Sequence, residues 1–401
     1  MSAEQTPRGM RHNIVFVGKR NVGKSSLINA VVGQDISIVS EIAGTTTDTV
    51  QKPYELLPLG PVTFIDTAGY DDNTALGTLR IAATNKALYK ADVAVLVFDK
   101  RGLADIDKKF LDKLKKMKLP VLAVFNKADE AKIKPGDVEF LQDNKIKFLD
   151  VSALEGLNIN TLKETMASLA AAEIRNDKTL LDGIVKQKQT VVLVAPIDSS
   201  APKGRLILPQ VQVLREILDE KACAMVCQPE ELEQTLLSLK KNPDLVITDS
   251  QAVAQVHRIV PQSIPLTTFS ILFARQKGDL KILVDGAEII DNLADNDKIL
   301  IAEACSHHAQ DDDIAKVKIP KLLQKYSNKT LNFDFCSGCD FPKDLNKYRL
   351  VIHCGGCMIS RTEMCHRLNE CCGHGVGVTN YGVAISKTQG ILQRVIKPFG
   401  L

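Results

Sequence analysis

The segment GKRNVGKS at residues 18–25 constrains the fold of this 401-residue chain more than any other feature. It follows an apolar run at residues 13–17 that reads as a β-strand, and it opens a helical pattern that runs toward residue 32. This is the order of elements in a phosphate-binding loop, whose glycines let backbone N–H groups turn inward around phosphate oxygens. The segment therefore predicts an α/β domain that binds a nucleotide.

The loop supplies most of the contacts that a nucleoside triphosphate needs. Lys24 brings a cation to the β- and γ-phosphates, and the Ser25 hydroxyl coordinates Mg²⁺. The nucleotide-binding residues predicted in this loop are Gly18, Asn21, Val22, Gly23, Lys24, Ser25 and Ser26.

Two further motifs complete the phosphate site. IDTAG at residues 65–69 ends a second strand, where Asp66 would hold the magnesium through water and Gly69 would donate its N–H to the γ-phosphate. GTTTD at residues 44–48 lies between the motifs, and Thr46 is our preferred ligand for the same metal among its three threonines. Lys24, Thr46 and Asn21 are the predicted catalytic residues.

The base-binding motif predicts that the nucleotide is GTP. An apolar run at residues 121–125 leads into Asn126, Lys127 and Asp129. The Asp129 carboxylate can accept two N–H groups of guanine, whereas adenine would leave buried groups unpaired. Ser152 and Ala153 then provide the loop that closes over the base.

These motifs together resemble a translation-factor-type small GTPase of the TrmE/Era-like branch, which contains tRNA-modification and ribosome-assembly GTPases. The resemblance covers residues 8–172. Tyr70 stands where a Ras-like enzyme has its water-orienting glutamine, and Asn21 occupies the position that helps this branch to bind K⁺. The resemblance implies slow, potassium-stimulated GTP hydrolysis; the alternative is that Asn21 only braces the loop.

Composition and charge exclude several classes of partner. The net charge is +3 and the basic residues are spread along the chain, which predicts no nucleic-acid stripe and no membrane anchor. No apolar run approaches the ~20 residues of a membrane span, and the polar N-terminus lacks a signal-peptide core. None of the ten cysteines precedes residue 223. We therefore expect a cytoplasmic protein whose clustered cysteines bind metal.

The remaining chain also reads as α/β. Strand-like runs at residues 190–196, 222–226 and 245–248 alternate with helical patterns and predict a small parallel sheet. Because this module is apolar and carries no catalytic motif, we expect it to form a homodimer. The expected regions are a GTPase domain at 8–172, a charged helical linker at 173–189, a dimerisation domain at 190–264 and an iron–sulfur cluster-binding domain at 265–401.

Two short motifs near the C-terminus predict a metal centre. CSH at residues 305–307 and HCGGC at residues 353–357 each follow a strand-like run. The thiolates of Cys305, Cys354 and Cys357, with two flanking imidazoles, suit a soft metal or an iron–sulfur cluster. In a cubane, three cysteines alone leave one iron free for an exchangeable ligand. The candidates for a fourth ligand, or for a side chain that hydrogen-bonds to the ligands, are His307, His353 and Asp198. The alternative for each histidine is a hydrogen-bonded place in the core.

Structural zinc is the competing interpretation of these cysteines. Cys336 and Cys339 form a CxxC pair that 14 residues separate from the pair of Cys354 and Cys357, which is close to zinc-ribbon spacing. A ribbon leaves the CSH motif unexplained, so the three-cysteine cluster accounts for more. The surplus cysteines are expected to be reduced, partly buried thiols, namely Cys336, Cys339, Cys365, Cys371 and Cys372.

The segments after the GTPase motifs GKRNVGKSS and AGTTTD include CSH, HCGGC, the loop PIDSSAPKGRLILPQ at 196–210 and TNYGVAI at 379–385. With these segments the chain closely resembles the [FeFe]-hydrogenase maturation GTPases of the HydF type. This resemblance covers nearly the whole chain. It implies a [4Fe–4S] cluster on Cys305, Cys354 and Cys357. It also implies a dimeric scaffold that receives a diiron precursor, built with two radical-SAM maturases, and delivers it to apo-hydrogenase.

A second function stays open from the sequence alone. The chain could be an RNA- or ribosome-associated GTPase whose C-terminal part is a structural zinc module. The low net charge and the absence of an Arg/Lys–aromatic patch argue against this alternative.

Overall fold

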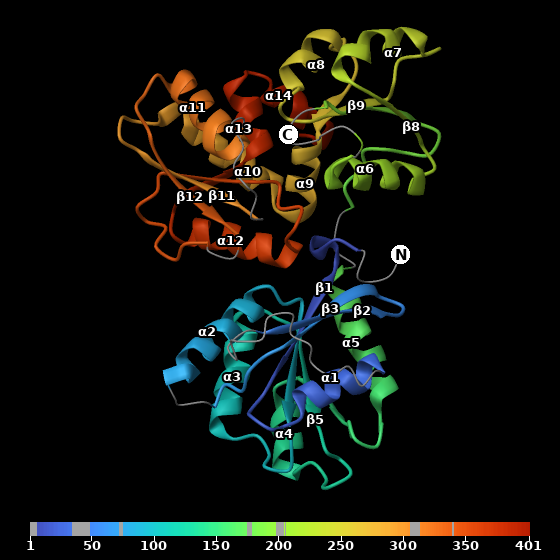
Figure 1. Cartoon of the computed structure of the whole chain (residues 1–401), viewed down its shortest axis with the longest axis vertical. Helices are drawn as coiled ribbons and strands as arrows, with labels where there is room; N and C mark the ends of the chain where they lie inside the picture. Colours follow the sequence, from blue (N-terminus) through green and yellow to red (C-terminus); the bar gives the residue numbers. More distant parts are fainter. Residues whose placement is uncertain are drawn as a thin grey trace. The chain divides into compact units, whose positions relative to one another are not determined.

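The computed structural model describes residues 6–33, 49–71, 75–174, 179–197, 204, 206–304, 313–338 and 341–401. The chain divides into two compact units, Met1–Asp177 and Lys178–Leu401, each drawn with its own helices and strands in Figure 1. Parallel or mainly parallel sheets covered by helices occur in both units, so the predicted α/β fold class is confirmed. Within the described residues, no helix is long and apolar enough to cross a membrane.

The first unit is built on a six-stranded sheet with the order β2-β3-β1-β4-β5-β6. All neighbouring strands are parallel except β2 and β3, which form an antiparallel pair. The strands are β1 (His12–Val17), β2 (Val50–Leu56), β3 (Gly60–Asp66), β4 (Val93–Phe98), β5 (Val121–Phe125) and β6 (Lys147–Asp150).

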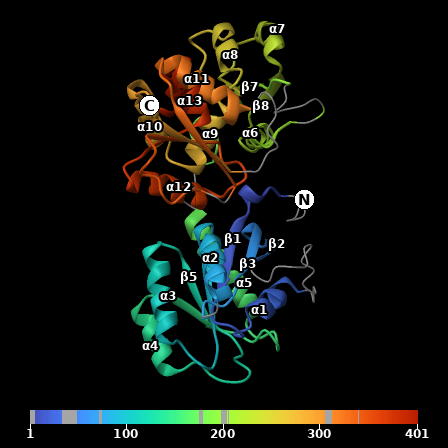
Figure 2. The same cartoon turned by 60° about the vertical axis from the view of Figure 1, so that its left-hand side comes forward.

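Helices cover both faces of this sheet, as Figures 1 and 2 show. Alternate residues of β1 point to opposite faces: Ile14 and Phe16 pack with α1 and α5, while Val15 and Val17 pack with α2, α3 and α4. Burial on both faces explains why the strands read as continuous apolar runs. The helices are η1 (Arg8–Met10), α1 (Lys24–Val32), α2 (Ala75–Tyr89), α3 (Asp105–Lys116), α4 (Pro135–Asp143) and α5 (Ile159–Ile174).

The second unit begins with a four-stranded parallel sheet of order β10-β9-β7-β8. Its strands are β7 (Thr190–Val194), β8 (Cys223–Cys227), β9 (Leu245–Thr248) and β10 (Leu266–Thr268). The associated helices are α6 (Leu208–Asp219), η2 (Pro229–Glu231), α7 (Leu232–Ser238), α8 (Val253–Ile259) and α9 (Phe269–Lys277). Helices α6 and α9 share a core with one face, and α7 and α8 share a core with the other.

A second four-stranded parallel sheet follows, with the order β12-β11-β13-β14. Its strands are β11 (Lys298–Glu303), β12 (Asn332–Ser337), β13 (Leu350–His353) and β14 (Gly377–Asn380). The helices are α10 (Leu280–Ala287), η3 (Glu288–Asn292), η4 (Ile314–Lys318), α11 (Ile319–Ser327), α12 (Arg361–Gly373), α13 (Tyr381–Thr388), α14 (Leu392–Ile396) and η5 (Lys397–Phe399). In Figure 1, α12 lies on one face of this sheet, and α11 and α13 lie on the other.

One hydrophobic core joins the two sheets of the second unit. It contains Val192 and Val246 from the first of these sheets and Ile299, Ile301 and Ile352 from the second, all fully buried. Because this core is continuous, the two sheets form one compact unit.

The segment before β7 differs from our expectation of a helical linker. Helix α5 ends at Ile174, and residues 179–189 form turns, so the helical interpretation of this stretch is wrong. Leu180 and Leu181 are buried against the first sheet of the second unit, and their N–H groups donate to the Glu216 carboxylate at 3.0 and 2.7 Å. The predicted domain boundaries, including the one between 264 and 265 just before β10, stay predictions.

The close packing of α10 on β14 gives a test of the second unit. Gly286 of α10 faces the backbone of β14, and a Cβ atom there would lie 2.0 Å from the Val378 carbonyl oxygen. We expect Gly286→Ala to lower the free energy of unfolding by about 1–3 kcal/mol, because the helix must move away from the strand. Urea denaturation followed by circular dichroism measures this difference.

Gly373→Ala is the matched control. Gly373 ends α12, and no atom would lie within 4 Å of its added Cβ. This substitution should leave stability unchanged or slightly raised. Equal stability of the two variants would contradict the packing argument for Gly286.

Candidate nucleotide site and metal centre

The phosphate loop connects β1 to α1, in the position that the sequence predicts. Gly23 precedes α1 with a φ of 88°, and a Cβ atom there would lie 2.4 Å from the side-chain nitrogen of Asn126. Asn21 has a φ of 62°, a left-handed conformation that asparagine tolerates better than most residues. Because α1 begins at Lys24, the free N–H groups of its first turn lie at this loop and favour an anion.

Lys24 is almost completely buried in the loop. Its Nζ donates hydrogen bonds to the carbonyl oxygens of Gly18 and Lys19 at 3.1 and 2.9 Å. Burial lowers the pKa of Lys24, and the nearby Asp66 carboxylate opposes this shift. A buried ammonium group held by neutral carbonyls gains stability from an added anion, so this loop is suited to phosphate.

Ser25 and Asp66 meet at the edge of the loop. The Ser25 hydroxyl donates a hydrogen bond to Asp66 Oδ2, whereas Asp66 Oδ1 is buried and has no hydrogen-bond partner among the described residues. Burial raises the pKa of Asp66, and the hydrogen bond from Ser25 opposes this shift. A hydroxyl beside an unpaired carboxylate oxygen fits the hard-ligand preference of Mg²⁺. Thr46 lies outside the described residues.

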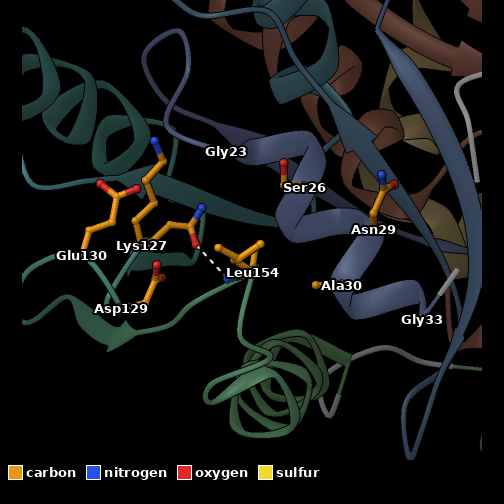
Figure 3. Close-up of a pocket in the computed structure, with 11 residues that line it drawn as sticks. Gly23, Ser26, Asn29, Ala30, Gly33, Lys127, Asp129, Glu130 and Leu154 are labelled. Atoms are coloured by element: carbon orange, nitrogen blue, oxygen red, sulfur yellow. Dashed lines mark hydrogen bonds between the residues drawn. The ribbon is translucent and has the colours of Figure 1, made fainter. Parts of the chain in front are cut away.

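A cavity of about 530 Å³ lies between α1 and the loop after β5 (Figure 3). Ser26 and Asn29 of α1 lie on one side, and Asp129 and Glu130 lie on the other. Leu154 borders the cavity between them, and this exposed residue was not singled out from the sequence. The predicted base-binding carboxylate is thus open to the cavity.

Asn126 connects the phosphate loop to the base-binding loop. Its Nδ2 donates to the Val22 carbonyl at 2.9 Å, and its Oδ1 accepts the N–H of Ala153 at 3.2 Å. Ser152 is fully buried, and its hydroxyl oxygen accepts the N–H of Glu155 at 3.0 Å. The structure therefore gives Asn126, Ser152 and Ala153 a bracing geometry beside the cavity.

An adjoining cavity of about 540 Å³ lies over the phosphate loop. Its lining includes seven predicted residues, which are Asn21, Gly23, Lys24, Ser25, Ser26, Gly69 and Lys127. Arg20 and Arg80 also line it and were not predicted. Arg20 lies within the loop motif, but at a position where the motif accepts any residue, so the sequence gave only a weak indication that it lines the cavity. Arg80 comes from α2, and no sequence motif indicates that it reaches this cavity.

Tyr70 follows the IDTAG motif but is held by α3. Its ring stacks on Phe110 with a centroid distance of 4.4 Å, and its hydroxyl donates to the Asp107 carboxylate. Asp107 also forms an ion pair with Lys19 of the phosphate loop at 2.5 Å and accepts the N–H of Ala104 at 2.7 Å. Burial and the Asp107 carboxylate raise the pKa of Tyr70. The Tyr70 hydroxyl is therefore bound to α3 through Asp107.

The candidate metal centre begins with Cys354, the residue after β13. Its N–H donates to the Ala302 carbonyl at 2.8 Å, and its Sγ accepts the N–H of Ala304 at 3.1 Å. Burial raises the pKa of the Cys354 thiol to about 11, and the hydrogen bond from Ala304 opposes this shift. Ala304 is the last described residue before Cys305.

Cys357 lies in the turn that leads to α12. Burial raises the pKa of the Cys357 thiol, and the charge of Lys277 opposes this shift. Lys277 is itself buried and donates a hydrogen bond to the Ile359 carbonyl. A cation near this sulfur would stabilise its thiolate form, which is the form that binds metal.

The other predicted ligands are placed as follows. His353 is buried and contacts Arg367. Burial is the main cause that lowers the pKa of His353 to about 4, and the positive charge of Arg367 lowers it further. Cys305, His307 and Asp198 lie outside the described residues. In the described part of the chain, no three His, Cys, Asp or Glu side chains are grouped so that they could hold a metal ion.

The surplus cysteines differ in burial. Cys371 is fully buried, and burial raises the pKa of its thiol to about 12. Cys336 and Cys365 are half-buried, and Cys372 is exposed. None of these four forms a disulfide in the described structure, while Cys339 lies outside the described residues.

The fold and the nucleotide site define a phosphate-loop GTPase domain followed by a unit with two parallel sheets. Residues 13–127 match the family model of a 50S ribosome-binding GTPase. Residues 180–278 match a hydrogen maturase F dimerization domain, and residues 281–398 match a hydrogen maturase F tetramerization domain. The chain therefore belongs to the HydF-type maturation GTPases, and the two matched domains indicate that it oligomerises.

Relatives of the GTPase half carry other names. The chain is 30% identical to a tRNA modification GTPase MnmE of Endomicrobium trichonymphae, over 59% of this chain and 50% of that protein. It is 39% identical to the GTPase Der of Wolinella succinogenes, over 40% of this chain and 36% of that protein. A crystal structure of Aquifex aeolicus Era is 28% identical, covering 39% of this chain and 56% of that chain with a TM-score of 0.34. The chain spans half or less of the two sequence relatives.

The cavity in Figure 3 gives a test of base selection at Asp129. We expect Asp129→Asn to weaken GTP binding by at least about tenfold, since the amide cannot accept both guanine N–H groups. The same variant should bind xanthosine triphosphate more tightly than the wild type does, because its base offers a carbonyl to the new amide. Titration with fluorescent nucleotides measures both affinities.

Glu130→Gln is the matched control, because Glu130 lines the same cavity and is also exposed. It should keep the preference of the wild type for GTP. An Asp129→Asn variant with unchanged GTP affinity would show that Asp129 does not read the base.

Proposed function

We propose that the chain hydrolyses GTP and acts as a cytoplasmic scaffold or carrier in [FeFe]-hydrogenase maturation. It would hold a [4Fe–4S] cluster and a diiron precursor of the hydrogenase cofactor. Two radical-SAM maturases would contribute to the precursor, and apo-hydrogenase would receive it. The observation that supports this proposal best is a GTPase domain followed by two domains of the hydrogen maturase F type.

The proposed cluster ligands are Cys305, Cys354 and Cys357. The hydrogen bond from the Ala304 N–H to Cys354 Sγ supports this set, because Cys305 is the next residue in the sequence. A cubane held by three cysteines leaves one iron open to an exchangeable ligand, and this is the chemistry that the cluster would supply. His307, His353 and Asp198 are the candidates for that fourth position.

The GTPase site would use two cations. Ser25, Thr46 and Asp66 would hold Mg²⁺, and the unpaired Oδ1 of Asp66 supports this assignment. Lys24 would stabilise the charge on the phosphates, and Asn21 would help to bind K⁺ beside them. Tyr70 cannot take the water-orienting role while its hydroxyl is bound to Asp107, so another group must supply this part of catalysis.

A homodimer is the oligomer that we propose for the second unit. Strand β8 lies at the edge of its sheet, so one side of its backbone has no neighbouring strand in the described chain. Val226 in this strand and Leu218 in α6 are about half exposed. An apolar edge of this kind is suited to pairing with the same edge of a second copy.

The alternative function is a GTPase associated with RNA or the ribosome that carries a zinc module. The alternative is motivated by relatives of the GTPase domain, one of which is named a tRNA modification GTPase. It has less support, because residues 180–398 match hydrogen maturase F domains almost throughout.

Metal analysis tests the scaffold proposal. We expect the full chain, reconstituted anaerobically, to contain about four irons and four sulfides and to give a cubane signal in electron paramagnetic resonance after reduction. Cys305→Ala, Cys354→Ala and Cys357→Ala should each lose this signal, because each removes one iron ligand.

Cys372→Ala is the control for these variants, because Cys372 is an exposed thiol outside the proposed set. It should keep the iron, the sulfide and the signal of the wild type. Stoichiometric zinc without sulfide, dependent on Cys336 and Cys339, would instead support the alternative function.

Hydrolysis in different salts tests the second cation. We expect GTP turnover to be at least about tenfold faster in KCl than in NaCl at equal ionic strength, because Asn21 helps to place K⁺ at the phosphates. Asn21→Gly should remove this difference. Glycine accepts the φ of 62° at this position, so the change removes the side chain without straining the loop. Equal turnover of the wild type in both salts would rule out this role for Asn21.

A further inference from the structure

Arg367 is the largest fully buried side chain among the described residues, and its guanidinium lies beside the candidate metal centre. Nη1 contacts His353 Nε2 at 2.9 Å, and Nη2 donates to the Gly338 carbonyl at 2.7 Å. Nη2 also contacts the Glu363 carboxylate at 2.6 Å, one turn earlier on α12. The guanidinium carbon lies 5.3 Å from the centre of the Phe341 ring.

These contacts permit only one form of the His353 ring. Nδ1 lies 2.8 Å from the Cys354 carbonyl oxygen, which can only accept a hydrogen bond, so Nδ1 must carry the proton. Nε2 lies against the Arg367 guanidinium, which can only donate, so Nε2 must be the unprotonated acceptor. His353 is therefore a neutral imidazole with both nitrogens in use.

The charge of Arg367 is balanced inside the protein. Glu363 is 3% exposed and supplies the opposite charge, and the Ser360 hydroxyl accepts the Glu363 N–H at 3.2 Å. A buried guanidinium needs both a counter-charge and hydrogen-bond acceptors, because removal from water is costly. If Nε2 bound a metal, it could no longer accept the hydrogen bond from Arg367. His353 is one of the acceptors that make this burial possible.

We propose that Arg367 is a positioning residue that keeps His353 away from iron. Through its hydrogen bond to His353 it also holds residues 354–357, the cysteine loop, in place. The ring bridges Arg367 to the carbonyl of Cys354, and Arg367 ties the same point to Gly338 after β12. His353 thus fixes the backbone at the first cysteine of the HCGGC motif and does not serve as the fourth ligand. The inference rests on the cluster proposed above at Cys354 and Cys357.

Arg367 also links the strand that carries Cys336 to the strand that leads into Cys354. β12 and β13 flank β11, where Ala302 is in register with both Cys336 and His353. Arg367 fills the space between the two strand ends and contacts the main chain at Gly338 and the side chain at His353.

Pulsed electron paramagnetic resonance on the reconstituted full chain tests the ligand assignment. A histidine bound to iron gives a strong nitrogen coupling to the reduced cluster. We expect His353→Gln to show the same nitrogen couplings as the wild type. His374→Gln is the control, because His374 is exposed and contacts Asn346. A strong coupling that is present in the wild type and lost only in His353→Gln would overturn the inference.

A second variant protects this test against misfolding of His353→Gln. The double variant His307→Gln and His308→Gln keeps His353 and removes both histidines of the CSH region. We expect its cluster to show no strong histidine coupling. A coupling that is present in this variant and lost when His353→Gln is added would assign iron binding to His353 and overturn the inference. A wild-type chain that binds no iron and sulfide would remove the proposed function together with the inference. A cluster with His353 as ligand would remove the inference alone.

The role of Arg367 has its own measurement. Lysine keeps the charge but cannot reach His353, Gly338 and Glu363 together. We expect Arg367→Lys to lose iron to a chelator on the order of tenfold faster than the wild type, because the cysteine loop is less firmly held. Arg361→Lys on the same helix is the control and should lose iron at the wild-type rate. Equal rates for Arg367→Lys and the wild type would show that Arg367 does not position the loop.

Discussion

Parallel strand pairing is the constraint on which the candidate sites of this chain depend. In a parallel sheet the carboxyl ends of neighbouring strands lie at one edge, so residues far apart in sequence are brought together there. The phosphate loop after β1 and Asp66 at the end of β3 meet in this way. The pairing of β11 with β13 has the same effect in the second unit, where Ala304 reaches the sulfur of Cys354.

Each unit buries a cation next to its site, and the two cations are satisfied differently. Lys24 is held mainly by neutral carbonyl oxygens of its own loop, so an incoming phosphate can provide the missing negative charge. Arg367 is already paired with Glu363 and bonded to His353 and Gly338. The first cation is therefore suited to binding a ligand and the second to holding a loop, although both side chains are nearly buried.

The parts of the site that the sequence predicted well are those set by local geometry. The phosphate loop could be recognised because a strand, a glycine turn and a helix start must follow one another within a few residues. The role of His353 could not be found in this way. The HCGGC motif shows that Cys354 follows His353. The hydrogen-bond partner Arg367 lies on a helix whose placement depends on the whole core, and no local pattern predicts it. The helical linker was a wrong prediction for a similar reason, because Leu180 and Leu181 are buried through tertiary contacts that override a helical pattern.

Hydrogen bonds in the first unit link the phosphate loop to a helix that binds no nucleotide. Lys19 belongs to the loop, its ammonium group pairs with Asp107 of α3, and Asp107 accepts the hydroxyl of Tyr70. The carbonyl of Lys19 also accepts a hydrogen bond from Lys24, the residue proposed to contact the phosphates. The loop, Tyr70 and α3 are therefore joined by one connected set of polar contacts.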